Sequence, residues 1–179
     1  NLKIMNLDFI NKFYVQPASS DAGVAIGATY VVGRKHGLEI QTMDTVYLGP
    51  EYTNDEIKKF LDILNVQYHF EKDPAHYGAK KVSENKVVGW FQGRMEIGPR
   101  ALGNRSILAN AANPSMRDLV NKKIKFRDTF RPFCPSVIED ESTYYFTGKQ
   151  PISPYMTINY DVNQSVIGKI PSVVHVDNT

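Results

Sequence analysis

The stretch VVGWFQGRMEIGPRALGNRS, residues 87–106, decides how this 179-residue chain is interpreted. Its first six residues are mostly β-branched or aromatic, which predicts a buried strand over 87–92. The fourteen residues that follow, 93–106, contain three glycines and three arginines. Glycine lets a backbone turn its N–H groups toward a ligand, and arginine binds phosphate through a planar fork that stays charged. A strand that ends in such a loop predicts a phosphate-binding site.

The loop does not match two common nucleotide-binding motifs. No Gly-Lys-Ser/Thr closes it, so it is not a Walker A loop, and it lacks the Gly-x-Gly-x-x-Gly spacing of a dinucleotide fingerprint. The alternative to a phosphate site is an exposed basic loop whose arginines pair with Asp and Glu. Residue types alone leave both interpretations open.

A second cationic group follows at Lys125 and Arg127. We expect these two side chains on the same side of an extended segment, because side chains alternate along such a segment. Phe126, Phe130 and Phe133 are expected to pack in the core, with stacking on a base as the alternative. The two basic groups are expected to converge on one polyphosphate.

Positive charge is concentrated in this part of the chain. Residues 94–131 contain nine Lys and Arg against three acids, a net charge of +6, whereas the whole chain carries only +2. Such asymmetry indicates a local anion site rather than a generally basic protein.

Alternating helices and strands predict an α/β or α+β domain. A buried helix over 24–32 is expected to approach another backbone closely, with Ser20 or Asp21 as its cap. A capping box at Thr53 and Glu56 begins a second helix that ends near residue 65. Further helices are expected over 74–83 and 113–124, and further strands over 13–16, 135–138, 155–158 and 173–177.

Composition excludes several classes of protein. Hydrophobic residues make up 42% of the chain and charged residues 22%, which excludes global disorder. No apolar run approaches the roughly 18 residues of a membrane span, so no membrane partner is expected. The single cysteine, Cys134, excludes an intrachain disulfide and a Cys-based zinc site, and it favours a reducing, cytoplasmic location. Because the chain begins without Met, we expect it to be a piece of a larger protein.

Residues 93–109, GRMEIGPRALGNRSILA, and residues 121–137, NKKIKFRDTFRPFCPSV, resemble the O-carbamoyltransferase family. This family includes nodulation carbamoyltransferases and enzymes that carbamoylate cephem and aminoglycoside antibiotics. Residues 16–28, 153–156 and 174–177 are similar to the family as well, so the resemblance covers most of the chain.

The resemblance implies a two-domain enzyme. Residues 1–50 would end an actin-like ATPase-fold domain similar to the catalytic domain of tRNA threonylcarbamoyl transferases. Residues 51–179 would form a YrdC-like domain, truncated at its C-terminus, with a twisted mixed sheet and flanking helices. The YrdC-like domain would make carbamoyl adenylate from carbamoyl phosphate and ATP with Mg²⁺, through carbamate. The first domain, with a bound iron or other divalent metal, would pass the carbamoyl group to a small-molecule hydroxyl acceptor.

The resemblance also implies site residues. Arg100, Lys125 and Arg131 would bind the adenylate and phosphates and act in catalysis. Companion residues for the nucleotide and its phosphates would be Arg94, Gly98, Arg105, Ser106, Arg127 and Ser136. Asp21 matches the family's metal-ligand aspartate, whereas by position alone it would be a helix cap. The family's histidine ligands would lie upstream of this chain, and His175 would help to shape the pocket.

Three alternatives remain open. An RNA-binding YrdC-like module would use the basic stretch and its phenylalanines to follow a phosphate backbone. Nucleic acid is nevertheless not the expected partner, because the charges fall in loops constrained by Gly and Pro. A hydrogenase-maturation carbamoyltransferase would need zinc-finger Cys pairs, and a purely structural piece would pair its cations with acids. Since the family continues beyond this chain, we expect the chain alone to perform no complete transfer.

Overall fold

The computed structural model describes residues 1–41, 43–148 and 151–179. Contacts group these residues into two compact units. The first unit comprises Asn1–Tyr14, Asp73–Gly89 and Ile107–Thr179. The second comprises Val15–Lys72 and Trp90–Ser106. The two units alternate along the chain, so they do not test the domain boundary expected at residue 50, which stays a prediction.

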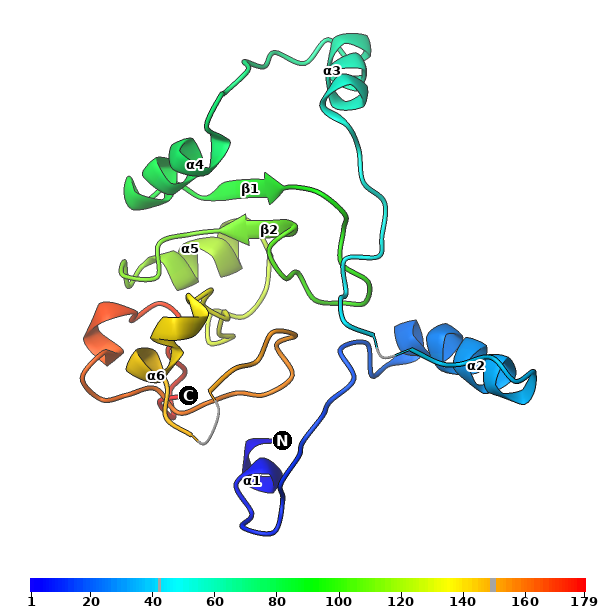
Figure 1. The fold of residues 1–179 in the computed structure, drawn as a ribbon. Helices are drawn as coiled ribbons and strands as arrows, with labels where there is room; N and C mark the ends of the chain where they lie inside the picture. The colour runs from blue at the N-terminus through cyan, green and yellow to red at the C-terminus, as the bar shows by residue number, and fades with distance from the viewer. Residues whose placement is uncertain (42, 149–150) are drawn as a thin grey trace. The chain divides into compact units, whose positions relative to one another are not determined.

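Helix α2, Asp21–Lys35, is the longest helix of the second unit (Figure 1). Ser20 holds its N-cap position but makes no side-chain capping bond. The helix approaches a neighbouring backbone as predicted, because a Cβ on Gly23 would lie 1.9 Å from the Ala18 carbonyl oxygen. The expected burial is wrong, since Gly33 is the buried residue of α2 and most of the others are exposed. Small apolar residues predict close packing, but burial also requires a partner surface.

Helix α3, Asn54–Ile63, confirms the predicted capping box. The Glu56 N–H donates to Thr53 Oγ1 at 3.3 Å, and the Thr53 N–H donates to Glu56 Oε2 at 2.8 Å. These reciprocal bonds satisfy N–H groups that the first turn leaves unpaired. The helix ends within two residues of the predicted position, and Asn65 then takes a left-handed conformation with φ +51°.

Helices α4 and α5 belong to the first unit. Helix α4, Pro74–Ser83, has the predicted bounds, with Asp73 accepting a bond from the His76 N–H at 3.0 Å. Helix α5, Met116–Lys123, begins later than expected. The side chain of Asn113 accepts bonds from the Ser115 N–H and hydroxyl, which forms a turn ahead of the helix. Shorter helical segments are α1 (Leu2–Met5), η1 (Glu139–Glu141), α6 (Ser142–Tyr145) and η2 (Ile167–Lys169).

Strands β1, Val88–Phe91, and β2, Arg105–Leu108, form a two-stranded antiparallel sheet (Figure 1). Strand β1 confirms the predicted strand, although its residues alternate between half-buried and exposed. Strand β2 was not predicted, because its sequence begins inside the Gly- and Arg-rich stretch. The pair confirms a mixed α/β fold class. The YrdC-like and actin-like architectures, including a larger twisted mixed sheet, stay predictions.

The strands expected over 13–16, 135–138, 155–158 and 173–177 are wrong. Local hydrogen bonds explain two of them. The Ser153 hydroxyl accepts the N–H groups of Thr157 and Ile158, which removes two ladder donors. In the last segment the His175 N–H donates to the Thr179 carbonyl oxygen, so the backbone turns. The other two segments lie in no strand, because a β-prone sequence still needs a neighbouring strand to pair with.

The core of the first unit is built from its C-terminal part. Four buried side chains form one apolar cluster, namely Val162, Val166, Ile170 and Val174. An isolated antiparallel bridge joins Phe146 to Val162, and the Ser172 hydroxyl donates to the Ala111 carbonyl oxygen at 3.0 Å. The segment that precedes this cluster carries the second cationic group. No helix in the described part of the chain is both long enough and apolar enough to cross a lipid bilayer.

Candidate functional site

The Gly-Arg loop, residues 93–106, belongs to the second unit. It begins after β1, and its last two residues are the first two of β2. Its glycines all have a positive φ: +52° at Gly93, +82° at Gly98 and +109° at Gly103. This region favours glycine, because a Cβ there clashes with the backbone. Gly98 also lies against Ala18, since a Cβ on Gly98 would be 3.3 Å from the Ala18 Cβ. Glycine is therefore required for the shape of the loop.

Glu96 lies at the centre of this loop and is only 5% exposed. Its Oε1 accepts the backbone N–H groups of Leu102 at 2.7 Å, Asn104 at 2.8 Å and Arg105 at 3.3 Å. Burial on its own raises the pKa of Glu96, but the backbone hydrogen bonds outweigh burial and the pKa is lowered. Oε2 is buried and has no hydrogen-bond partner among the described residues. Glu96 is therefore the anion around which the loop folds.

This arrangement reduces the number of backbone donors that the Gly-Arg loop can offer to a phosphate. Three N–H groups of the loop point at its own carboxylate, so they are not available to a ligand. The Gly103 N–H is also used, since it donates to Ser106 Oγ at 3.0 Å. These four N–H groups belong to residues 102–105, and phosphate binding by the loop stays a prediction. The central position of Glu96 was not predicted, although a single acid among three arginines is a signal that could have identified it.

The three arginines of the loop have different surroundings. Arg94 stabilises the loop, because its Nε donates a hydrogen bond to the Gly49 carbonyl oxygen at 3.2 Å. Asn104 Nδ2 donates a second hydrogen bond, to the Arg94 carbonyl oxygen at 2.8 Å. Arg100 and Arg105 are exposed, and neither belongs to any ion pair among residues 1–41, 43–148 and 151–179. This observation disfavours a basic loop that only pairs with acids.

The cationic loop, residues 124–133, follows α5 in the first unit and is organised by Asn121. The Asn121 side chain is fully buried, and its Nδ2 donates to the carbonyl oxygens of Thr129 at 3.3 Å and Arg131 at 2.9 Å. Its Oδ1 accepts a bond from Arg127 Nε at 2.7 Å. Nothing in the local sequence distinguishes Asn121 from a surface residue, and only its tertiary contacts identify it.

Arg127 is therefore part of the scaffold of the cationic loop. Its guanidinium carbon lies 4.9 Å from the centre of the Phe133 ring, in a cation–π contact. Burial lowers the pKa of Arg127, and repulsion from Arg131 lowers it further. Lys125, Arg131 and the predicted companion Ser136 are exposed.

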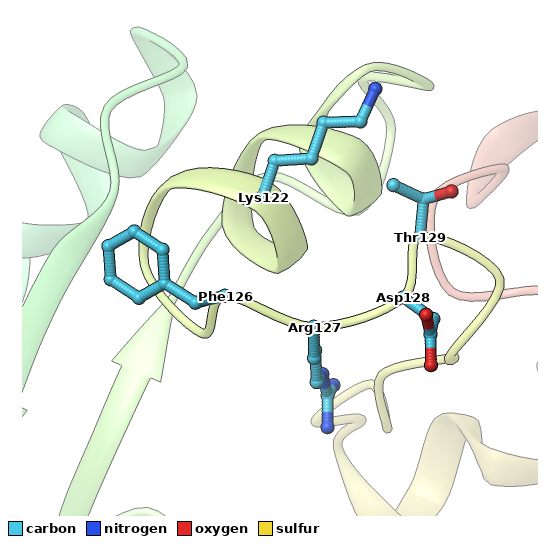
Figure 2. Close-up of a pocket in the computed structure, with 5 residues that line it drawn as sticks. All are labelled: Lys122, Phe126, Arg127, Asp128 and Thr129. Carbon is cyan, nitrogen blue, oxygen red and sulfur yellow. The ribbon is translucent and has the colours of Figure 1, made fainter.

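Two expectations for the cationic loop are wrong. Phe126 has φ +48°, so the segment is not extended, and the alternation that was expected to place Lys125 and Arg127 on the same side is absent. Phe126 is 83% exposed and Phe130 is 64% exposed, so neither packs in the core. Phe126 lines an open depression of about 720 Å³ (Figure 2). The other lining residues are Lys122, Arg127, Asp128 and Thr129.

The predicted site residues divide between the two units. Arg94, Gly98, Arg100, Arg105 and Ser106 belong to the second unit. Lys125, Arg127, Arg131 and Ser136 belong to the first. The first group lies within residues 94–106 and the second within residues 125–136. Convergence of the two groups on one polyphosphate stays a prediction.

Asp21, the expected metal ligand, is the exposed first residue of α2. Among the described residues, no group of three or more His, Cys, Asp or Glu is placed to hold a metal ion. Asp21 can thus supply one ligand, and the described residues do not form a metal site by themselves.

The segment around His175 forms a small polar cluster in the first unit. His175 Nδ1 lies 2.8 Å from Asp177 Oδ1, which also accepts the Thr179 hydroxyl at 2.8 Å. The hydrogen bond with His175 is the main cause that lowers the pKa of Asp177 to about 2, and the bonds from Thr179 add to it. These bonds hold the imidazole in one orientation.

Comparison with known proteins gives a consistent family. Residues 79–179 match the family described as Carbamoyltransferase C-terminus. An uncharacterized protein of Synechocystis sp. is 37% identical over 209 residues, which cover all of this chain and 34% of that protein. Nodulation protein NolO of Bradyrhizobium diazoefficiens is 33% identical over 189 residues, covering all of this chain and 34% of that protein. Nodulation protein U of Rhizobium tropici is 34% identical over 181 residues, covering all of this chain and 30% of that protein.

The chain thus spans about a third of the length of these relatives. The family match covers more than half of the chain and includes both the Gly-Arg loop and the cationic loop. The chain therefore belongs to the carbamoyltransferase family, and residues 79–179 match the C-terminal domain of that family.

Proposed function

We propose that this chain is the part of an ATP-dependent carbamoyltransferase that binds ATP and carbamoyl phosphate and forms carbamoyl adenylate. The observation that carries the proposal is a set of exposed cations on two loops that are each held by internal hydrogen bonds. Arg100, Arg105, Lys125 and Arg131 are exposed, and none of them takes part in an ion pair among the described residues. Because the loops are shaped by Glu96 and Asn121, these cations are free for an anionic ligand.

The proposed chemistry has two steps in this part of the enzyme. Water first cleaves carbamoyl phosphate to carbamate and inorganic phosphate. A carbamate oxygen then attacks the α-phosphorus of ATP, the bond from that phosphorus to the pyrophosphate oxygen breaks, and carbamoyl adenylate forms. Negative charge grows on the pyrophosphate oxygens as the bond breaks, and fixed cations stabilise it. No protein nucleophile is needed for either step.

We assign this stabilisation to Arg100, Lys125 and Arg131. The two arginines stay charged at neutral pH, and the planar guanidinium of each can bind two phosphate oxygens at once. Arg105 and Ser136 would add further contacts from exposed positions. Arg94, Gly98, Ser106 and Arg127 would act by holding the loops in shape, since each already makes an internal contact.

Transfer of the carbamoyl group would complete the reaction in the whole protein. The acceptor hydroxyl oxygen would attack the carbamoyl carbon, AMP would leave, and the hydroxyl proton would be released. A small-molecule acceptor and an iron or other divalent metal fit the family resemblance. Asp21 would contribute one metal ligand.

Single-stranded nucleic acid is a second candidate ligand, favoured by the exposed rings of Phe126 and Phe130 beside cations. The two candidates differ in their response to salt. Binding to several backbone phosphates weakens steeply as salt rises, whereas binding of one nucleotide responds less.

The proposal can be tested by calorimetric titration of the chain with ATP at two salt concentrations. We expect Arg100→Ala to weaken ATP binding by about 10- to 100-fold, because a charge-assisted hydrogen bond contributes about 1.5–3 kcal/mol. Arg34→Ala is a matched control, since Arg34 is an exposed arginine of the same unit in the last turn of α2. Equal ATP affinity in the wild type and Arg100→Ala would contradict the assigned site.

A further inference from the structure

Phe126 has an unusual conformation for an aromatic residue. Its φ of +48° lies in the left-handed region, which is unfavourable for a bulky side chain with a Cβ. Its ring is 83% exposed, so no burial of apolar surface compensates for that backbone. Strained backbone of this kind persists where the surroundings enforce it, and it is found at functional sites.

Hydrogen bonds on both sides of Phe126 enforce the turn. The Lys125 N–H donates to the Val120 carbonyl oxygen at 2.9 Å, and the Arg127 N–H donates to the Asn121 carbonyl oxygen at 3.0 Å. Val120 and Asn121 are both buried residues of α5. The Phe126 ring is thus presented to solvent by a turn anchored to the end of a helix.

The ring contributes to the depression shown in Figure 2. The depression is open to solvent and has a volume of about 720 Å³. Residues 117–131 around it contain six Lys and Arg against two Asp. One of the acids is Asp118, whose Oδ2 lies 3.9 Å from Lys122 Nζ. The other acid, Asp128, lines the depression itself. The surface therefore offers one flat apolar ring in a region of net positive charge.

This combination matches a ligand with a flat aromatic ring and several negative charges. A nucleoside triphosphate has both features, because its base can stack on the ring while its phosphates face the cations. An apolar peptide would leave the cations unpaired, and an inorganic polyphosphate would leave the ring unused. Charge complementarity thus favours a nucleotide over either of these.

We propose that Phe126 is the stacking platform for the base of the bound nucleotide. The inference rests on the proposed function, since it assigns the base-binding residue of the same ATP molecule. In this assignment the phosphates lie toward Lys125 and Arg131, and Asn121 holds the platform in place through Arg127.

The test compares two ligands that share phosphates and differ in the base. The chain would be titrated calorimetrically with ATP and with inorganic tripolyphosphate, in the wild type and in Phe126→Leu. We expect Phe126→Leu to weaken ATP about 10-fold and to leave tripolyphosphate unchanged, since stacking on an aromatic contributes about one decade of affinity per base. Phe130→Leu is the matched control, because Phe130 is also exposed but does not line the depression.

The possible outcomes separate this inference from the proposed function. If Phe126→Leu weakens both ligands equally, or neither, stacking is overturned while a phosphate site stands. If ATP binds the wild-type chain no better than tripolyphosphate, stacking is likewise overturned. If the wild-type chain binds neither ligand, both proposals are overturned. Binding of a single-stranded oligonucleotide with a steep salt dependence, without ATP binding, would overturn both in favour of nucleic acid.

Two further variants give readouts that do not depend on activity. Phe126→Gly removes the left-handed strain, so we expect a higher urea midpoint of unfolding together with weaker ATP binding. In Phe126→Trp the indole fluorescence should be quenched when ATP is added, whereas Phe130→Trp should show little change. Equal quenching in the two tryptophan variants would contradict the assignment.

Discussion

The Gly-Arg loop of the second unit folds around a buried acid, whereas the cationic loop of the first unit folds around a buried amide. Glu96 accepts three backbone N–H groups. Asn121 donates to two backbone carbonyl oxygens and accepts one guanidinium bond. The two loops have similar numbers of arginines, yet their backbones turn opposite polar groups inward.

This difference determines which cations remain available. A carboxylate takes up backbone donors, so Arg100 and Arg105 stay exposed in the Gly-Arg loop. The amide oxygen takes up Arg127 itself, so that cation becomes part of the scaffold. The number of arginines in a loop therefore does not show how many of them are free to bind a ligand. The polar residue at the centre of the loop must be known as well.

The largest expected effect is on the stability of the Gly-Arg loop. Glu96→Ala leaves three partly buried N–H groups without an acceptor, and we expect it to lower the free energy of unfolding by about 3–5 kcal/mol. Urea unfolding followed by circular dichroism measures this loss. Glu51→Ala is the control, because Glu51 is an exposed acid of the same unit. A loss below about 0.5 kcal/mol, the usual effect of a surface substitution, would mean that the loop does not depend on its acid.

The corresponding change in the cationic loop is Asn121→Asp. The new carboxylate would face the carbonyl oxygens of Thr129 and Arg131, which are acceptors, so we expect a loss of about 2–4 kcal/mol. The same unfolding measurement applies, with the exposed Asn11→Asp as control. If Asn121→Asp left stability unchanged, the amide hydrogens would not be needed and the contrast between the loops would fail.

A smaller effect separates scaffold arginines from free ones. Arg127→Ala removes a hydrogen bond and a cation–π contact, so we expect a loss of about 1–2 kcal/mol. Arg105→Ala should stay within about 0.5 kcal/mol of the wild type, since the Arg105 side chain is exposed. Calorimetry would then show weaker ATP binding for Arg105→Ala. Equal losses of stability in the two variants would contradict the division into scaffold and free cations.

The smallest expected effect is on the pH dependence of stability. Because the folded pKa of Glu96 is lowered, its contribution is fully present above the ordinary glutamate pKa of about 4.3 and is lost as pH falls through the folded value. We expect the difference in unfolding free energy between wild type and Glu96→Gln to shrink as pH falls below that value. Asp177 also titrates in acid, but it is common to both proteins and cancels. A difference that does not change between pH 7 and pH 3 would be inconsistent with an ionised Glu96.

Local sequence predicted the helices whose ends are stabilised by their own neighbours. Thr53 with Glu56, and Asp73 with Pro74, satisfy or remove the unpaired N–H groups of a first turn within four residues. No strand forms over 13–16, 135–138, 155–158 or 173–177, because a strand needs a partner strand, which can come from anywhere in the chain. In residues 155–158 a single hydroxyl, that of Ser153, takes the donors instead.

The candidate site was predicted in composition but not in organisation. Residue types were enough to mark the Gly-Arg loop and the cationic loop, since Gly at positive φ and charged Arg act through local properties. The exposure of Phe126 and the scaffold role of Arg127 were missed, because both depend on contacts with α5.

The sequence by itself determined the family, the two cationic loops and the helices that begin with their own caps. These features depend on interactions between residues a few positions apart, or on a motif that can be recognised from the order of the residues alone. Tertiary structure alone decided that Glu96 and Asn121 lie at the centres of those loops. A buried polar group is satisfied by partners that folding brings to it, so the same acid or amide is a solvated side chain until the chain has folded.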